Sequence, residues 1–183
     1  MRPQARGDHL EALHGALLPY YLQIKFVHLF MVAMWAFSTA VAYRNYIVPV
    51  FRAWQAAPDD ADRVAARNLA MERFDKGAVL EHVAFPLVLI TGLLMVWLAG
   101  WPWQELNWLA VKLAIIGIIF VPMEAVDYYI SHGGGNKRRI RHSGDMQRYE
   151  AMTVFHWGFF RVTTPLVVIF IPLLFYLAVT KPL

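Results

Sequence analysis

The 183-residue chain contains no cysteine. Disulfides, thiolate metal sites and covalently attached c-type haem are therefore excluded. A metal ion or a haem iron would have to take its ligands from histidine, methionine, lysine or carboxylate side chains. This absence narrows the range of cofactors before any motif is considered.

Charge is also scarce, because only 16% of the residues are charged while 58% are hydrophobic. Soluble domains carry more charge than this, typically about 25%. The apolar residues gather into long blocks at about 21–51, 77–99, 109–130 and 152–179. Each block is close to or above the ~20 residues that a helix needs to cross a bilayer. The sequence predicts an all-α integral membrane four-helix bundle that forms a single domain over residues 1–183.

A short amphipathic stretch, residues 8–18, precedes the first block and has Leu10, Leu13 and Leu17 on one side. Pro19 is expected to end it, so we predict a short N-terminal helix lying in the membrane interface. The first apolar block starts late and has no small-residue cleavage site. It is therefore interpreted as a retained span and not as a signal peptide.

The basic residues lie mainly in two long connections between the apolar blocks, near 52–76 and 137–148. The opposite face of the predicted bundle has only Arg2, Arg6 and Lys181. The positive-inside rule places both long loops in the cytoplasm and both termini outside. We therefore expect a multi-pass membrane protein with both long loops in the cytoplasm, with the lipid bilayer and not nucleic acid as its partner.

Ionisable side chains inside membrane helices are costly, so each of them is a candidate functional residue. Near the predicted outer boundary, Lys25 and His28 are three residues apart and share a helix face, which Trp35 continues. Lys112 lies near the start of the third span. The alternatives to a functional role are lysines that extend to the interface and a histidine that is hydrogen-bonded between helices.

A second group of ionisable residues lies near the predicted cytoplasmic ends of all four spans. It consists of Arg44, Glu81, His82, Glu124, Asp127, His156 and Arg161. One interpretation is a structural ion-pair network in which Arg44 and Arg161 neutralise the carboxylates.

The other interpretation starts from His82 and His156, which lie on different helices at matching depth. Two facing imidazoles are a common way to hold haem b when cysteine is absent. The same histidines with Glu81, Glu124 and Asp127 would instead suit a non-haem transition metal. Both cofactors remain open at this point.

Three short motifs follow one another along the chain. They are Lys25-Phe-Val-His28 followed by Trp35, a second span with Pro86 and Gly92, and Trp108-Leu-Ala-Val-Lys112-Leu113. This order resembles the HemJ-like membrane protoporphyrinogen IX oxidases, small bacterial helix-bundle proteins that bind b-type haem. The resemblance implies roles in haem binding and activity for His28 and Lys112.

The chain also departs from that family's pattern. Its second span begins with Glu81-His82 where the family has an Arg and Asn pattern. Its fourth span has Arg161-Val-Thr-Thr-Pro165 where the family has Asn-Glu-x-Pro. The resemblance therefore predicts the fold, the membrane setting and haem more strongly than it predicts the porphyrinogen reaction.

The leading functional hypothesis is a haem b-binding membrane oxidoreductase or electron-transfer protein, with a porphyrin or a quinone as substrate. Its expected cofactor-binding residues are Lys25, His28, Trp35, His82, Lys112, His156 and Arg161. One alternative is a transition-metal carrier or sensor that uses the His and carboxylate set. The other is a membrane anchor subunit that docks a partner subunit, or a second copy, through its basic loop.

Overall fold

The structure is a computed structural model that describes residues 4–102 and 107–182. Within these ranges the regular structure is entirely helical. Four helical stretches in the described residues are long and apolar enough to cross a membrane, judged by length and composition: His9–Ala56, Ala61–Ala99, Trp108–Ser131 and Met146–Thr180. The prediction of an all-α chain with four membrane-length helices is confirmed.

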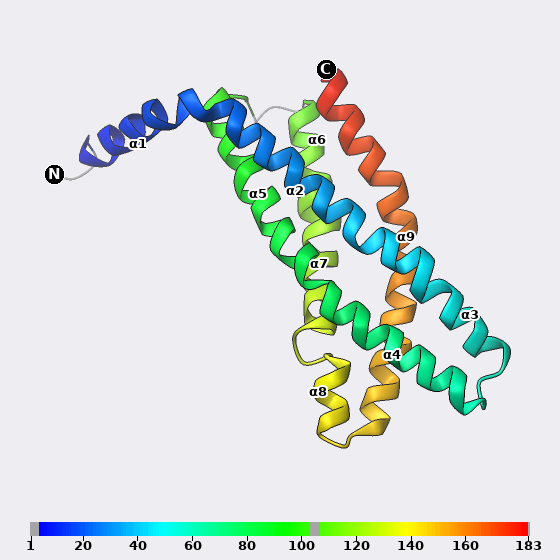
Figure 1. Ribbon diagram of the computed structural model, residues 1–183. Helices are drawn as coiled ribbons and strands as arrows, with labels where there is room; N and C mark the ends of the chain where they lie inside the picture. The colour runs from blue at the N-terminus through cyan, green and yellow to red at the C-terminus, as the bar shows by residue number, and fades with distance from the viewer. Residues whose placement is uncertain (1–3, 103–106, 183) are drawn as a thin grey trace.

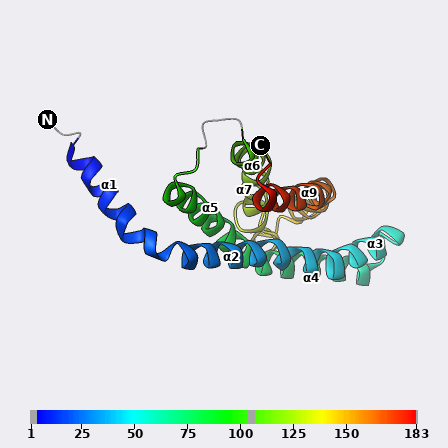
Figure 2. The same ribbon diagram turned by 90° about the horizontal axis from the view of Figure 1, so that it is seen from above.

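Each of the first two stretches is built from shorter helices that follow one another. The first contains α1 (Gln4–Leu17), a 3₁₀ turn (Leu18–Tyr20), α2 (Tyr21–Ala42), a π-helical turn (Tyr43–Ile47) and α3 (Val48–Ala56). The second contains α4 (Ala61–Gly77) and α5 (Val79–Ala99). The 3₁₀ turn falls at Pro19, where the short N-terminal helix was expected to end. Helix α1 projects away from the bundle in both views (Figure 1, Figure 2).

The last two stretches complete the bundle. The third contains α6 (Trp108–Ile115), a π-helical turn (Ile116–Phe120) and α7 (Val121–Ser131), and the fourth is α9 (Met146–Thr180). A six-residue helix, α8 (Lys137–His142), lies in the loop between them. Polar side chains cap these helices: Asn107 accepts hydrogen bonds from backbone amides of α6, Asn136 from α8, and Asp145 from α9. Such caps satisfy amide groups that a helix start leaves without partners.

Two apolar clusters hold the helices together. In one, Trp35, Ala84, Phe85 and Phe120 join α2, α5 and the π-helical turn of the third stretch. The other joins α3, α4 and α9 through the buried side chains of Ile47, Phe51, Met71, Phe74, Ala78 and Phe160. The polar groups described below lie where the helices of these two clusters meet.

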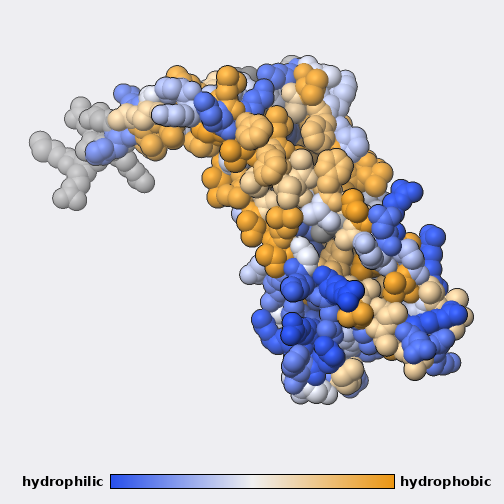
Figure 3. Space-filling view, in the orientation of Figure 1, coloured by the Kyte–Doolittle hydropathy of each residue, from blue (hydrophilic) through white to orange (hydrophobic). Residues whose placement is uncertain are grey.

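The surface divides into an apolar part and a polar end. Hydrophobic side chains cover the part formed by α2, α5 and α6, and hydrophilic side chains gather around α8 and the neighbouring part of α4 (Figure 3). Among the exposed apolar residues, Leu22, Phe37 and Ile118 are 73%, 69% and 75% exposed. An exposed apolar surface of this kind is typical of a face that contacts lipid or another protein.

Candidate functional site

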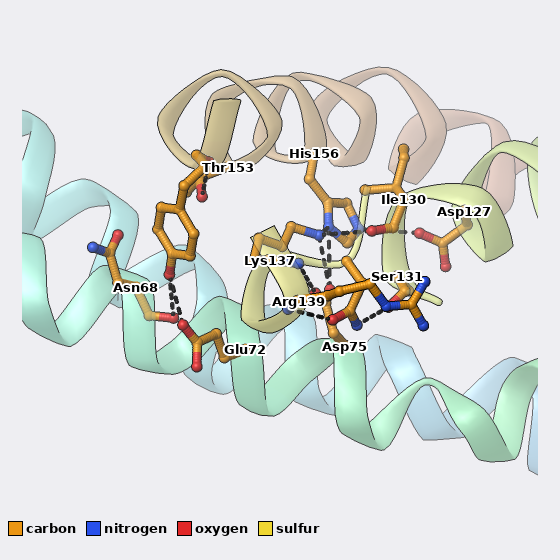
Figure 4. Close-up of polar contacts among 12 residues, drawn as sticks. Asn68, Glu72, Asp75, Asp127, Ile130, Ser131, Lys137, Arg139, Thr153 and His156 are labelled. Atoms are coloured by element: carbon orange, nitrogen blue, oxygen red, sulfur yellow. Dashed lines mark hydrogen bonds and ion pairs between the residues drawn. The ribbon is translucent and has the colours of Figure 1, made fainter. Parts of the chain in front are cut away.

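Five ionisable side chains from five helices meet inside the polar end of the bundle, and we call them the inner polar cluster. They are Asp75 of α4, His82 of α5, Asp127 of α7, Lys137 of α8 and His156 of α9. Their side chains are almost completely buried, and those of Lys137 and His156 have no exposed surface. Figure 4 shows four of them, with the side chains of Lys137 and His156 lying between Asp75 and Asp127.

His156 is bound at both ring nitrogens. Its Nε2 lies 3.0 Å from Oδ1 of Asp127, and its Nδ1 is hydrogen-bonded to the ammonium group of Lys137. A charged ammonium group can only donate, so Nδ1 accepts and carries the lone pair. It follows that Nε2 carries the proton and donates it to Asp127.

Lys137 uses all three of its ammonium hydrogens. Nζ lies 2.8 Å from Oδ1 of Asp75 and 3.3 Å from the carbonyl oxygen of Ile130, and it also contacts His156 Nδ1. Burial lowers the pKa of Lys137, and the neighbouring carboxylate of Asp75 opposes this shift. A buried charge is tolerated when it is paired and fully hydrogen-bonded, and Lys137 meets both conditions.

A turn of three consecutive glycines brings Lys137 back into the bundle. A Cβ atom on Gly135 would lie 2.8 Å from the Cα of Ile130, and one on Gly133 would lie 2.9 Å from the carbonyl oxygen of Tyr129. Only glycine allows the loop to pass this close to the end of α7. Asn136 then donates a hydrogen bond to the carbonyl oxygen of Ser131 and caps α8, which starts at Lys137.

Asp127 joins the two histidines that the sequence placed at matching depth. Its Oδ2 lies 3.3 Å from Nε2 of His82, while its Oδ1 binds His156. The ring of His82 packs edge-on against the rings of Tyr128 and His132. Both predicted inner histidines therefore turn inward and meet on a single carboxylate.

This arrangement leaves His156 without a free lone pair for a metal ion. Within the described ranges, the structure contains no group of three or more His, Asp or Glu residues arranged to hold a metal ion. Haem or a non-haem metal at His82 and His156 stays a prediction from sequence, and their observed partners are protein groups.

Beside the cluster, a groove of about 1120 Å³ runs along α2, α3 and α9. Asp127, Glu124 and Glu81 line its inner wall, and the indole nitrogen of Trp35 donates to Oε1 of Glu124 over 2.8 Å. The other lining side chains are mainly aromatic or aliphatic. Trp35, which the sequence pattern placed on the helix face of His28, thus lines this groove.

Three arginines, Arg44, Arg52 and Arg161, also line the groove. Arg44 and Arg161 are exposed, and among the described residues neither forms an ion pair with Glu124 or Asp127. Neutralisation of Glu124 and Asp127 by these two arginines, which was one of two interpretations of the sequence, is therefore not observed among the described residues. The side chains that lie against the Asp127 carboxylate are those of His82 and His156. One interpretation of the sequence had assigned these two histidines to a cofactor.

A second, smaller cavity of about 430 Å³ lies on the other side of the cluster, at the polar end. Residues of α4 and α8 line it, and they include Asp75, Glu72 and Arg141. The inner polar cluster thus separates this cavity from the groove, with Asp75 bordering the cavity and Asp127 bordering the groove.

At the other end of the bundle, the residues that carry the family resemblance come together. Nδ1 of His28 lies 3.0 Å from the hydroxyl oxygen of Thr91, and that hydroxyl lies 2.5 Å from the carbonyl oxygen of Leu87. A hydroxyl has one proton, which it donates to Leu87, so it accepts from His28 Nδ1. His28 is then the Nδ1–H tautomer, and its Nε2 carries the lone pair.

Gly92 and Lys112 complete this outer site. A Cβ atom on Gly92 would lie 3.2 Å from Cε1 of His28, so the small residue makes room for the ring. Lys112 of α6 is half-buried and close enough to interact electrostatically with His28. Lys25, which was also expected here, is exposed.

Sequence reasoning selected neither Lys137 nor Asp75 as a site residue. Lys137 opens the run Lys-Arg-Arg-Ile-Arg, which by composition is an exposed basic loop. The signal that could have identified it is the preceding Gly133-Gly134-Gly135-Asn136, which provides a close turn and a helix cap.

The chain was compared with protein-family models, with curated proteins and with solved structures, and none of them matches it. The function must therefore be argued from the residues themselves.

Proposed function

We propose that this chain is a multi-pass protein of the bacterial inner membrane, with both long loops in the cytoplasm and both termini outside. Four helices of membrane length and the exposed apolar side chains around them support insertion. The basic residues of the two long loops, among them those of α8 at the polar end, support this orientation. In this orientation the inner polar cluster lies at the cytoplasmic end and His28 near the outer boundary.

Within that setting, we propose a haem b-binding membrane oxidoreductase similar to the HemJ-like protoporphyrinogen oxidases. The observation that carries the proposal is the state of His28. A histidine that binds a metal donates its other ring N–H to a fixed acceptor, and this acceptor sets the tautomer. Thr91 provides that acceptor and leaves Nε2 as the ligand atom.

The outer site therefore fits a haem iron through its donor chemistry. A bound haem b would supply one-electron chemistry at the iron. The protein's own contribution is to orient the His28 ring through Thr91 and to place the Lys112 ammonium group beside it. A positive charge at this position attracts an anionic group on a bound molecule.

The groove is the proposed substrate site. Its aromatic wall suits a flat apolar ring system, and Arg44, Arg52 and Arg161 suit carboxylates, which arginine binds in a bidentate manner. A tetrapyrrole with carboxylate side chains matches both features, whereas a quinone matches only the first. The proposed substrate class is therefore a porphyrin or porphyrinogen.

Absorption spectra of the purified protein test the haem proposal. We expect a Soret band in protein from haem-replete cells and its loss in His28→Ala. Thr91→Val removes the acceptor of the Nδ1 proton and should weaken haem binding by roughly 10–100-fold. Thr180→Val is the matched control, since the Thr180 hydroxyl donates to the carbonyl of Tyr176 in its own helix and the residue lies outside the groove. A colourless wild-type preparation, or full haem content in His28→Ala, would refute the proposal.

A further inference from the structure

The inner polar cluster is a continuous chain of proton-bearing groups between two spaces. Asp75 borders the cavity at the polar end, and Asp127 borders the groove. Between them, Lys137 contacts Asp75 and His156, and His156 contacts Asp127. Every link is a direct hydrogen bond, so no bridging group is needed.

We propose that Asp75, Lys137, His156 and Asp127 form a proton relay that connects the cavity at the polar end with the inner wall of the groove. The relay goes beyond the proposed function and does not depend on haem. What it carries is the proton itself, delivered to or removed from a molecule that occupies the groove.

The observed hydrogen bonds define the steps of the transfer. Lys137 gives a proton to Nδ1 of His156, and His156 gives the proton on Nε2 to Oδ1 of Asp127. The carboxylate of Asp75 takes a proton from the cavity and gives it to Lys137, which the first transfer has left neutral. Asp127 releases its proton into the groove, so one proton enters and one leaves. His156 is left with its proton on Nδ1, and transfer in the reverse direction along the same hydrogen bonds returns the proton to Nε2.

Two features of the surroundings favour this path. Burial lowers the pKa of Lys137, so its ammonium group releases a proton more readily than an exposed lysine. The rings of Phe74 and Phe160 pack against His156 with centroids 5.8 and 4.2 Å away, and the imidazole has no exposed surface. Water therefore does not reach the ring, and a proton that crosses at His156 passes through its two nitrogens.

The other ionisable groups near the relay lie on both of its sides, and one of them, His132, lines the cavity at the polar end. His82 contacts Asp127, Glu124 interacts with both of them, and His132 packs on His82. Glu124 also lines the groove, so it is the natural acceptor after Asp127. A molecule that fills the groove would block the entry of protons from the open side of the groove. The relay would still connect the inner wall of the groove with the cavity at the polar end.

A pH jump on the full-length protein in phosphatidylcholine nanodiscs tests the relay. The reporter is the infrared carbonyl band of the Glu124 carboxyl group, assigned by its loss in Glu124→Gln. Lys137→Arg is the decisive variant, because arginine keeps the charge and the donors but does not release its proton in proteins. We expect the protonation rate of Glu124 to fall by roughly 100-fold. Arg139→Met, an exposed position on the same helix, is the control and should keep the wild-type rate.

His156→Ala provides a second arm. This variant should show the same slow rate, and added imidazole should restore it, which a purely structural role would not predict. Equal rates in wild type, Lys137→Arg and folded His156→Ala would overturn the relay, because protons would then reach Glu124 through the mouth of the groove. Haem content is measured in the same samples, so the failure of one proposal is distinguished from the failure of the other.

Discussion

The two ends of the bundle each hold a lysine, and the two lysines have opposite surroundings. Lys112 lies in an apolar span, is half-buried, and has no hydrogen bond or ion pair to any other residue that the structure describes. Lys137 lies in a basic loop, yet it is fully buried and donates three hydrogen bonds. Lys112, which the sequence places in an apolar span, thus has fewer contacts to the described residues than Lys137. Lys137, which the sequence places in a basic loop, is part of the buried core.

This difference indicates that the two lysines have different roles, one in ligand binding and the other in the buried core. A half-buried cation without a protein partner is available to an incoming anionic group. A cation whose three hydrogens are already used can only hold the fold together or pass a proton to one of its acceptors. The outer site therefore suits a ligand, and the inner polar cluster suits structure and proton transfer.

Replacement of each lysine should give the largest difference in the free energy of unfolding. Lys137→Met leaves the Asp75 carboxylate buried without its partner, and breaking a buried pair in this way costs about 3–5 kcal/mol. Lys112→Met is the matched control and should leave the free energy of unfolding nearly unchanged. Unfolding of both purified variants in a denaturing detergent titration measures the difference.

A double variant makes this prediction sharper. Asp75→Asn combined with Lys137→Met removes both charges, so it should recover part of the stability that Lys137→Met loses. If Asp75→Asn changes stability by the same amount in the wild type and in Lys137→Met, Asp75 and Lys137 are not energetically coupled. The assignment of Lys137 to the core would then be wrong.

The fold was largely predictable, because apolar blocks of membrane length dictate helices whatever their partners are. The ends of the helices were less predictable than the helices themselves. Helix α4 continues through a polar segment that a hydropathy pattern treats as a loop. Helix α9 begins at Met146, before the expected residue 152. There, caps such as Asp60 and Asp145 and packing against neighbouring helices decide the ends, and hydropathy does not measure these.

The candidate site was predictable in composition but not in pairing. His82, Asp127 and His156 do come together, because helical spacing and depth place them at one level. Which charges meet was not predictable, because Lys137 enters from a loop and pairs with Asp75, while Asp127 pairs with two histidines and not with an arginine. Hydrophobic periodicity shows which residues share a helix face, but it does not show where the residues of a loop lie in the folded protein.

The glycine turn that delivers Lys137 offers a second, smaller test. Gly135→Ala would place a Cβ 2.8 Å from the backbone of Ile130, and overpacking of this kind costs about 1–3 kcal/mol. Gly158→Ala is the control: it lies in α9 with open space around it, and alanine there should stabilise the helix by up to ~1 kcal/mol. Detergent unfolding should therefore move in opposite directions for the two variants.

The smallest expected effect concerns an ion pair on the same helix as Lys137 but at its surface. Arg141 lies 2.9 Å from Glu72, and its side chain is 52% exposed. Exposed pairs contribute only about 0.2–1 kcal/mol, and salt screens them. Arg141→Ala should therefore lower stability slightly at low ionic strength and not at all at high salt, whereas the loss in Lys137→Met should persist in salt because water and ions do not reach that pair. Equal salt sensitivity in both variants would show that Lys137 is solvated, and the contrast between a buried and an exposed pair on one helix would disappear.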